Sequence, residues 1–159
     1  MIHYICYASP LGMLTVAAED EKLTALVIEG QKYADRCLFG ADREKETPVL
    51  RAAGLWLDQY FDGQNPDVAV LPLAPKGTDF QKRVWKALMT IPYGHTVSYG
   101  ELAEKLGSSA RAVGMAVGRN PLSILIPCHR VLGADGSLTG YAGGLVNKEK
   151  LLKLEGSLK

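Results

Sequence analysis

Residues 98–118 read SYGELAEKLGSSARAVGMAVG and predict two short helices joined by a tight turn. Ser98 is followed three residues later by Glu101, which is the spacing of a helix capping box, and Gly107 marks the end of the first helix. The second helix is expected over 110–118. Two short helices joined by a few residues that include a glycine are typical of a helix-turn-helix motif. This stretch therefore predicts a mostly helical domain in the second half of the chain.

The expected second helix consists mainly of small residues, and Arg111 carries its only charge. A glycine inside a helix costs about 1 kcal/mol relative to alanine, so Gly114 and Gly118 indicate that a partner approaches this helix closely. Two interpretations stay open from the pattern alone. The helix can pack tightly inside the domain, or it can lie in a groove of DNA with Arg111 as a probe.

The flanking segments extend the helical pattern over residues 77–159. Thr78 and Gln81 repeat the capping-box spacing at the start of another helix. The apolar stripe of that helix contains Phe80, Val84, Trp85 and Leu88. A last amphipathic helix is expected to end at Gly156.

The first half of the chain alternates like β-strands. Short runs separated by turn residues predict an antiparallel meander over 3–7, 13–17 and 23–28. Proline at a first helical position predicts a helix from Pro48 to Gly63. The stretch 31–46 predicts no element, and a last short strand that continues into a linker is expected over 66–75. We therefore expect a chain of the α/β (α+β) class with two domains, 1–76 and 77–159.

The 159 residues have a formal net charge of +1, which alone argues against a nucleic-acid partner. The charges are unevenly divided, however. Residues 1–76 have seven basic and 11 acidic side chains, a net charge of −4, whereas residues 77–159 have 11 basic and six acidic side chains, a net charge of +5. Such asymmetry is a hint of polyanion binding by the basic half, although chance segregation on solvated faces gives the same numbers. If the asymmetry is functional, a polyanion would contact 77–159, with the acidic half facing away and an affinity that salt weakens.

The three cysteines, Cys6, Cys37 and Cys128, cannot all pair, and none has the spacing of a zinc site. Free thiols indicate a reducing compartment. Neither a signal peptide nor an apolar run of the roughly 18 residues that span a membrane is visible. The sequence therefore predicts a cytoplasmic protein without a membrane association and without a metal site.

Residues 120–131 read NPLSILIPCHRV, which predicts an apolar strand that delivers Cys128, His129 and Arg130 in succession. A free cysteine has a pKa of about 8.5, so a neighbouring base or cation is needed to make the thiolate at neutral pH. Consecutive side chains on an extended chain point to opposite sides, and contact between the thiol and the imidazole would need a bend or a bridging water. The alternative is a buried, inert thiol.

The segment Ile126-Pro127-Cys128-His129-Arg130-Val131 resembles the active-site signature of the O6-alkylguanine-DNA alkyltransferases, also called methylated-DNA–protein-cysteine methyltransferases. Five further segments are similar to that family in order and spacing: 93–103, 110–114, 120–121, 140–145 and 148–156. The resemblance is strong over about 77–159. Over 1–76 it is architectural only, and it implies a small ribonuclease-H-like domain there.

The resemblance implies DNA repair by irreversible, stoichiometric transfer of the alkyl group from O6-alkylguanine to Cys128, with O4-alkylthymine as a second candidate substrate. His129 would act through a water as the base toward the thiol, and Glu155 would orient the imidazole. Tyr99 would donate a hydrogen bond to the guanine, and Asn120 would hold the strand that carries the cysteine. No cofactor is implied, the partner is double-stranded DNA, and a monomer is expected.

The resemblance also implies a DNA-binding face. The damaged nucleotide would be flipped out through the minor groove, and Arg111 would intercalate into the vacancy. The other residues assigned to DNA contact are Ser98, Ala110, Ala112, Gly114 and Arg119.

The implied substrate pocket contains Val117, Val131, Tyr141, Ala142, Gly143 and Lys148. The carbonyl groups of Cys128 and Val131 would accept hydrogen bonds from the exocyclic amine of guanine, and the amide of Ala142 would donate to the alkylated oxygen. Some relatives have serine at the position of Ala142 and a larger, methionine-like side chain at that of Val117. For Lys148, a solvated surface position explains the sequence equally well.

Two other functional classes compete with alkyl transfer. One is a module that recognises and bends alkylated DNA without repairing it, and the presence of Cys128 weighs against this class. The other is a cysteine hydrolase that uses Cys128, His129 and Glu155, for which the sequence offers no evident oxyanion hole.

Overall fold

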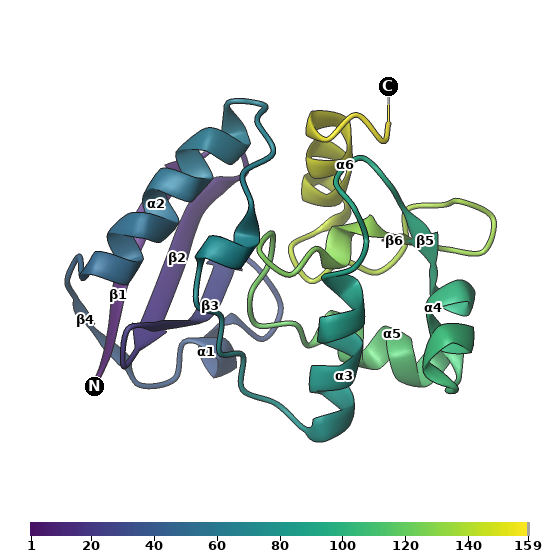
Figure 1. The fold of residues 1–159 in the computed structure, drawn as a ribbon, viewed down its shortest axis with the longest axis horizontal. Helices are drawn as coiled ribbons and strands as arrows, with labels where there is room; N and C mark the ends of the chain where they lie inside the picture. The colour runs from purple at the N-terminus through teal and green to yellow at the C-terminus, as the bar shows by residue number, and fades with distance from the viewer. Residues whose placement is uncertain (159) are drawn as a thin grey trace.

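The chain folds into two halves that lie side by side, a small sheet with a helix across it and a mostly helical part (Figure 1). A computed structural model describes residues 1–158. The first half contains, in order, β1 (Ile2–Ser9), β2 (Gly12–Glu19), β3 (Lys22–Ile28), α1 (Ala34–Cys37), β4 (Ala41–Glu44), α2 (Pro48–Phe61) and the 3-10 helix η1 (Val68–Val70). The second half contains α3 (Asp79–Leu88), β5 (Val97–Ser98), α4 (Tyr99–Leu106), α5 (Ala110–Gly118), the 3-10 helix η2 (Cys128–Arg130), β6 (Val131–Leu132) and α6 (Leu145–Leu154).

The first three strands form the antiparallel meander that their alternation predicts. β1 pairs with β2 and β2 with β3, both antiparallel, while β4 adds to the free edge of β1 in parallel, so that the sheet order is β3-β2-β1-β4. The sequence analysis missed α1 and β4 in the stretch 31–46. Both have only four residues, which is too short for a hydrophobic period to show.

Helix α2 covers one face of this sheet (Figure 1). It starts at Pro48, as expected, and its buried side chains are Val49, Leu50, Ala53, Trp56, Leu57 and Tyr60. The strand expected over 66–75 is wrong. That segment contains the turn of η1, which the Asp67 carboxylate caps, and a single bridge between Leu73 and Leu23. Its three prolines have no amide hydrogen to give to a strand ladder.

Both predicted capping boxes are present in the helical half. Thr78 with Gln81 caps α3, and Ser98 with Glu101 caps α4. Gly107 ends α4 in the left-handed region, at φ 66°, where glycine is favoured. The short turn that follows leads into α5, which packs against α3 and α4. The helix-turn-helix arrangement is therefore confirmed.

The apolar strand expected over 120–131 is wrong. Most of the segment is irregular, with Ile124 at φ 73°, and it closes in the 3-10 turn of η2. It is apolar because it is buried between the two halves, where the amide of Leu26 donates to the Pro121 carbonyl at 2.8 Å and the amide of Ser123 donates to the Leu26 carbonyl at 3.0 Å. A short apolar run alone does not distinguish a strand from another buried segment.

One continuous hydrophobic core includes residues of both halves. The mixed α/β class with a sheet-containing first half and a helical second half is confirmed, whereas a boundary after residue 76 stays a prediction. Among residues 1–158, none of the helices is long and apolar enough to cross a membrane.

Candidate active site

Cys128 lies at the start of the η2 turn, where its side chain is buried. The segment that leads to it is folded by Asn120, which is itself buried. The Asn120 amide nitrogen donates to the Ile126 carbonyl at 2.8 Å, and its oxygen accepts from the Leu122 amide at 3.0 Å. Asn120 therefore holds both ends of the irregular segment that delivers the cysteine.

The Cys128 thiol is protonated at neutral pH. Burial raises its pKa to about 11, although the nearby Asn120 amide and the positive charge of Lys148 oppose that rise. A buried thiol of this kind is inert until a neighbouring group accepts its proton. The site therefore needs a base close to Cys128.

His129, the next residue, is a fully buried imidazole. Its Nε2 lies 2.7 Å from Glu155 Oε2, whereas its Nδ1 is buried without a hydrogen-bond partner among the described residues. Burial lowers the pKa of His129, with Glu155 acting in the opposite direction. Since the carboxylate accepts a hydrogen bond from Nε2–H, the neutral ring has its free lone pair on Nδ1. The 3-10 turn supplies the bend that an extended strand lacks, and the imidazole is equipped to accept a proton.

Glu155 follows α6 directly and accepts hydrogen bonds from three side chains. One is His129. The second is Arg130, whose Nε lies 2.8 Å from Oε1 and whose Nη2 lies 3.1 Å from Oε2. The third is Tyr60, whose hydroxyl oxygen lies 2.5 Å from Oε2. Burial opposes ionisation of the carboxyl, but the hydrogen bonds and charges of His129 and Arg130 prevail and lower its pKa to about 2. Glu155 is therefore a fixed anion behind the imidazole.

The sequence analysis gave neither Arg130 nor Tyr60 a role. Arg130 stands in the quoted signature, and its position next to His129 is the only sequence signal for it. Tyr60 belongs to the apolar face of α2 and is 95 residues away from Glu155 in the chain. Nothing in the sequence connects those two residues.

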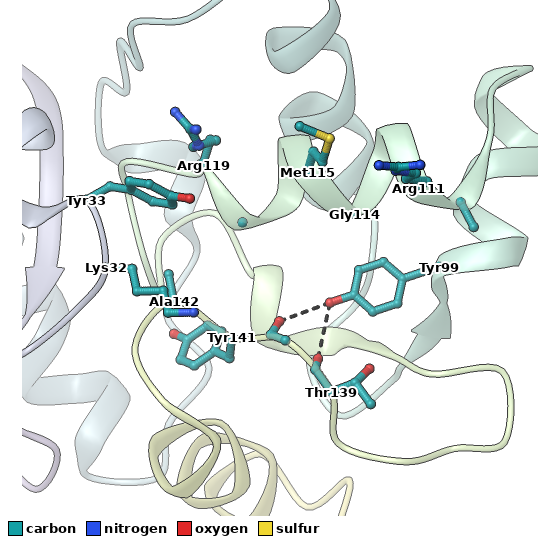
Figure 2. A pocket seen from close by; sticks show the side chains of 13 residues that line it. Lys32, Tyr33, Tyr99, Arg111, Gly114, Met115, Arg119, Thr139, Tyr141 and Ala142 are labelled. Carbon is teal, nitrogen blue, oxygen red and sulfur yellow. Dashed lines mark hydrogen bonds between the residues drawn. The ribbon is translucent and has the colours of Figure 1, made fainter.

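A cavity of about 560 Å³ opens beside α5 (Figure 2). Its lining includes Tyr99, Ala110, Arg111, Gly114, Arg119, Tyr141 and Ala142. The Tyr99 hydroxyl donates to the backbone carbonyls of Gly140 at 3.0 Å and Thr139 at 3.3 Å, the two dashed contacts in Figure 2. Burial raises the pKa of Tyr99 to about 12, so the hydroxyl keeps its proton and remains a donor.

Cys128 is not part of the cavity lining, but it lies next to residues that are. Tyr141 is buried, lines the cavity and is close enough to the Cys128 thiol for each to affect the pKa of the other. Gly143 follows in the same loop, and a Cβ there would meet Ile28 Cδ1 and Tyr141 Cε2 at 2.8 Å. Any larger residue at this position would therefore displace the Ile28 side chain or the Tyr141 ring.

Lys148 is fully buried, so the solvated surface position considered for it is wrong. Its ammonium group donates to the Val131 carbonyl at 2.5 Å and to the Thr139 carbonyl at 2.9 Å, and burial lowers its pKa to about 8. Lys148 thus ties β6 to the loop that lines the cavity. The Val131 carbonyl, the expected acceptor for guanine, already accepts this bond and has one further lone pair to offer.

The remaining expected residues divide between the cavity face and the interior. On α5, Val113, Ala116 and Val117 are buried, whereas Arg111 and Met115 are exposed. Tight packing inside the domain therefore describes one face of this helix, and a position in a groove of DNA stays a prediction for the face that exposes Arg111. Ala112 is half-buried, and the hydroxyl of Ser98 is engaged as the cap of α4.

The acidic half does not face away from the cavity as a whole. Lys32 and Tyr33, from the segment before α1, line the same cavity as Arg111 (Figure 2). The Arg119 guanidinium lies over the Tyr33 ring, 4.1 Å from its centre. Net charge averaged over 76 residues gave no sign of this local contribution.

The fold and the site define a class of protein that combines a helix-turn-helix with a buried cysteine followed directly by a buried histidine. Comparison with known proteins gives the family. A model described as "6-O-methylguanine DNA methyltransferase, ribonuclease-like domain" matches residues 2–75, and one described as "6-O-methylguanine DNA methyltransferase, DNA binding domain" matches residues 79–157. The chain belongs to the 6-O-methylguanine DNA methyltransferase family.

Individual relatives match over nearly the whole chain. Methylated-DNA–protein-cysteine methyltransferases from Mycobacterium bovis and Methanosarcina acetivorans are 49% and 45% identical to it, with 99% and 98% of this chain and 94% and 99% of the relatives covered. The crystal structure of Mycobacterium tuberculosis OGT in complex with DNA is similar with a TM-score of 0.85 at 45% identity, over 98% of this chain and 93% of that one. The similarity includes both halves of the fold.

Proposed function

We propose that this chain repairs double-stranded DNA by transferring the alkyl group of O6-alkylguanine to the sulfur of Cys128. The family, the names of the relatives and the relative crystallised with DNA support this function. The observation that carries it is the buried His129, which follows the cysteine directly, is hydrogen-bonded to Glu155 through Nε2 and has no partner for Nδ1 among residues 1–158. This arrangement suits a thiol that must lose its proton only when the substrate is in place.

In the proposed reaction, the residues of the site act one after another. His129 Nδ1 takes the thiol proton through a bridging water, and the sulfur attacks the alkyl carbon in line with the bond to O6. A carbon–sulfur bond forms, the carbon–oxygen bond breaks, and the bonding electrons pass to the guanine. Tyr99 leaves its bonds to the loop carbonyls and donates to the departing base, so that guanine is not released as a bare anion. The thioether is stable, and each protein molecule therefore reacts once.

The base must leave the duplex before it can reach the site. Flipping a nucleotide out of the stack costs a few kcal/mol, and Arg111 stands exposed on α5 at the cavity, where it can enter the vacancy. Guanine then lies between Tyr99 and the loop 140–144. The Ala142 amide donates to the alkylated oxygen, and the Cys128 and Val131 carbonyls accept from the exocyclic amine.

The rest of the proposal concerns the setting of this reaction. The transfer needs no metal or organic cofactor, because a thiolate attacks the alkyl carbon in line and the leaving group is a purine. The chain acts as a monomer in the cytoplasm, with a domain boundary after residue 76. O4-alkylthymine is the second candidate substrate.

Mass spectrometry tests the transfer directly. After incubation with duplex DNA that contains O6-methylguanine, the peptide containing Cys128 should gain about 14 Da, one methyl group in place of a hydrogen. The peptides containing Cys6 and Cys37 serve as internal controls and should keep their masses. An unmodified Cys128 peptide after complete conversion of the lesion would contradict the proposal.

Arg111→Ala should slow repair of duplex DNA by about tenfold or more, since each 1.4 kcal/mol lost in filling the vacancy is a factor of ten. Transfer from the free base O6-benzylguanine, which needs no flipping, should be unaffected. Rates on both substrates are measured in single-turnover experiments. Lys86→Ala removes the same charge from an exposed position of α3 and is the matched control. An equal loss on both substrates would show that Arg111 does not act on flipping.

A further inference from the structure

The carboxylate behind His129 is shared with a tyrosine from the other half of the molecule. The Tyr60 hydroxyl, on α2, donates a hydrogen bond to Glu155 Oε2 at 2.5 Å, and His129 Nε2 lies 2.7 Å from the same oxygen. Both residues are buried, with 1% of Tyr60 and 5% of Glu155 exposed. Short O–H···O⁻ bonds of this length are charge-assisted and about twice as strong as neutral ones.

The Tyr60 ring is fixed independently of its hydroxyl group. It stacks on Trp56 with ring centres 5.3 Å apart, and it meets Phe61 edge to face at the same distance. Burial and the nearby Glu155 charge raise the pKa of Tyr60 far above its ordinary value, so the hydroxyl is a permanent donor. The fixed ring thus holds the hydroxyl group as a hydrogen-bond donor to Glu155 Oε2, the same oxygen that accepts from His129 Nε2.

Several other groups act on the same pair. Glu155 also faces Arg130, and Tyr93 and Tyr141 lie within electrostatic reach of it. His129 is further affected by the positive charges of Arg130 and Lys148, which oppose its protonation. All of these groups belong to residues 77–159, and Tyr60 is the one group named here that comes from the first half of the chain.

We propose that Tyr60 is a positioning residue for alkyl transfer, which limits the negative charge that Glu155 presents to His129 and so keeps the imidazole neutral and ready to take the Cys128 proton. This inference rests on the proposed function of His129 as the base. A carboxylate that has lost the Tyr60 hydrogen bond would attract the Nε2 proton more strongly and favour the imidazolium, which has no lone pair for the thiol proton. The first half of the chain thereby takes part in the reaction through a single hydroxyl group.

Tyr60→Phe tests the proposal because it removes the hydroxyl and keeps the stacked ring. Without the hydroxyl, the Glu155 charge acts more strongly on His129 and favours the imidazolium, and a rise of half a pKa unit is about a threefold loss of the neutral ring at acid pH. We therefore expect the acid limb of the pH profile of transfer to move upward by about half a unit or more. The rate should fall about threefold at acid pH and stay unchanged at alkaline pH. Single-turnover rates on O6-methylguanine duplex DNA give this profile.

The matched control is Tyr7→Phe. Tyr7 also donates to a carboxylate of α2, Asp58, at 2.6 Å, but on the exposed side of the molecule. Its loss should leave the pH profile in place. A profile of Tyr60→Phe that coincides with the unmodified protein, a rate loss that is equal at every pH, or an equal shift in Tyr7→Phe would each overturn the proposal.

A second readout does not depend on the reaction. Nuclear magnetic resonance of labelled histidine follows protonation of His129, with His3 and His95 as references, and the His129 titration should move upward in Tyr60→Phe. If Tyr60→Phe folds poorly, 3-fluorotyrosine at position 60 replaces it, because this more acidic phenol donates more strongly and should move the titration downward. An unmoved titration overturns the inference. Failure of the unmodified protein to methylate Cys128 overturns the proposed function instead.

Discussion

Replacing Cys128 with alanine should abolish alkyl transfer completely while the protein continues to bind duplex DNA that contains O6-methylguanine. The sulfur is the only atom proposed to form a bond with the alkyl group, and no other described side chain of the site is a comparable nucleophile at neutral pH. The residues of α5 and the loop 140–144 that are proposed to contact DNA are untouched by the change. Loss of the methyl group from labelled DNA measures transfer, and fluorescence anisotropy measures binding.

The other two cysteines provide the controls for Cys128→Ala. Cys6 is exposed, Cys37 is partly buried, and neither of these free thiols lines the cavity beside α5. Cys6→Ala and Cys37→Ala should each transfer at the normal rate. Residual transfer by Cys128→Ala would place the acceptor elsewhere, and normal repair without any modified cysteine would favour another mechanism.

Glu155→Gln should destabilise the protein by about 3–5 kcal/mol and slow transfer strongly, because it leaves a buried cation without its counter-charge. Only 12% of the Arg130 side chain is exposed, and its guanidinium makes two hydrogen bonds to Glu155. His129 would also lose the anion that orients its ring. Urea denaturation measures the free energy of unfolding.

The same helix supplies a matched control for the loss of one negative charge. Glu149, on α6, pairs with Lys153 at 3.0 Å, but both side chains are about half exposed. Such pairs contribute about 0.5 kcal/mol or less, so Glu149→Gln should hardly change stability or transfer. A Glu155→Gln variant as stable as Glu149→Gln would show that the buried network is not a stabilising one.

The free energy of unfolding at acid pH should depend on the ionisation of Glu155. The pKa of Glu155 lies at about 2 in the folded chain, below its ordinary value of 4.5. A depressed pKa means that the ionised form stabilises the fold, fully above about pH 4.5, and that this contribution is lost as the pH falls toward 2. Glu155→Gln should therefore lose stability less steeply than the unmodified protein over this range.

Local signals in the sequence predicted the capped helices α3 and α4 and the three-stranded meander. The capping residues at Thr78 and Ser98 and the stop at Gly107 act within one turn of chain, so that neighbouring residues alone decide them. The alternation of the first three strands gave the meander for the same reason. Short elements such as β4 escaped prediction because pairing with β1 forms them, and their own residues have no period.

The segment 120–131 shows where local reading fails. Its apolar residues fit a strand, but two prolines and the Asn120 clamp fold it into an irregular path that ends in a 3-10 turn. Burial between the halves of the molecule explains why the segment is apolar. The 3-10 turn at its end sets the relative positions of Cys128 and His129. A straight strand would have pointed Cys128 and His129 to opposite sides.

By itself, the sequence determined the α/β class, the helix-turn-helix and the family, since capping, turn and signature residues are close together along the chain. Only the tertiary structure decided which groups surround Glu155, that Lys148 is buried, and that Lys32 and Tyr33 of the acidic half line the cavity. The physical reason is distance along the chain. Tyr60 and Glu155 are 95 residues apart, and only packing of α2 against the helical half brings the hydroxyl to the carboxylate.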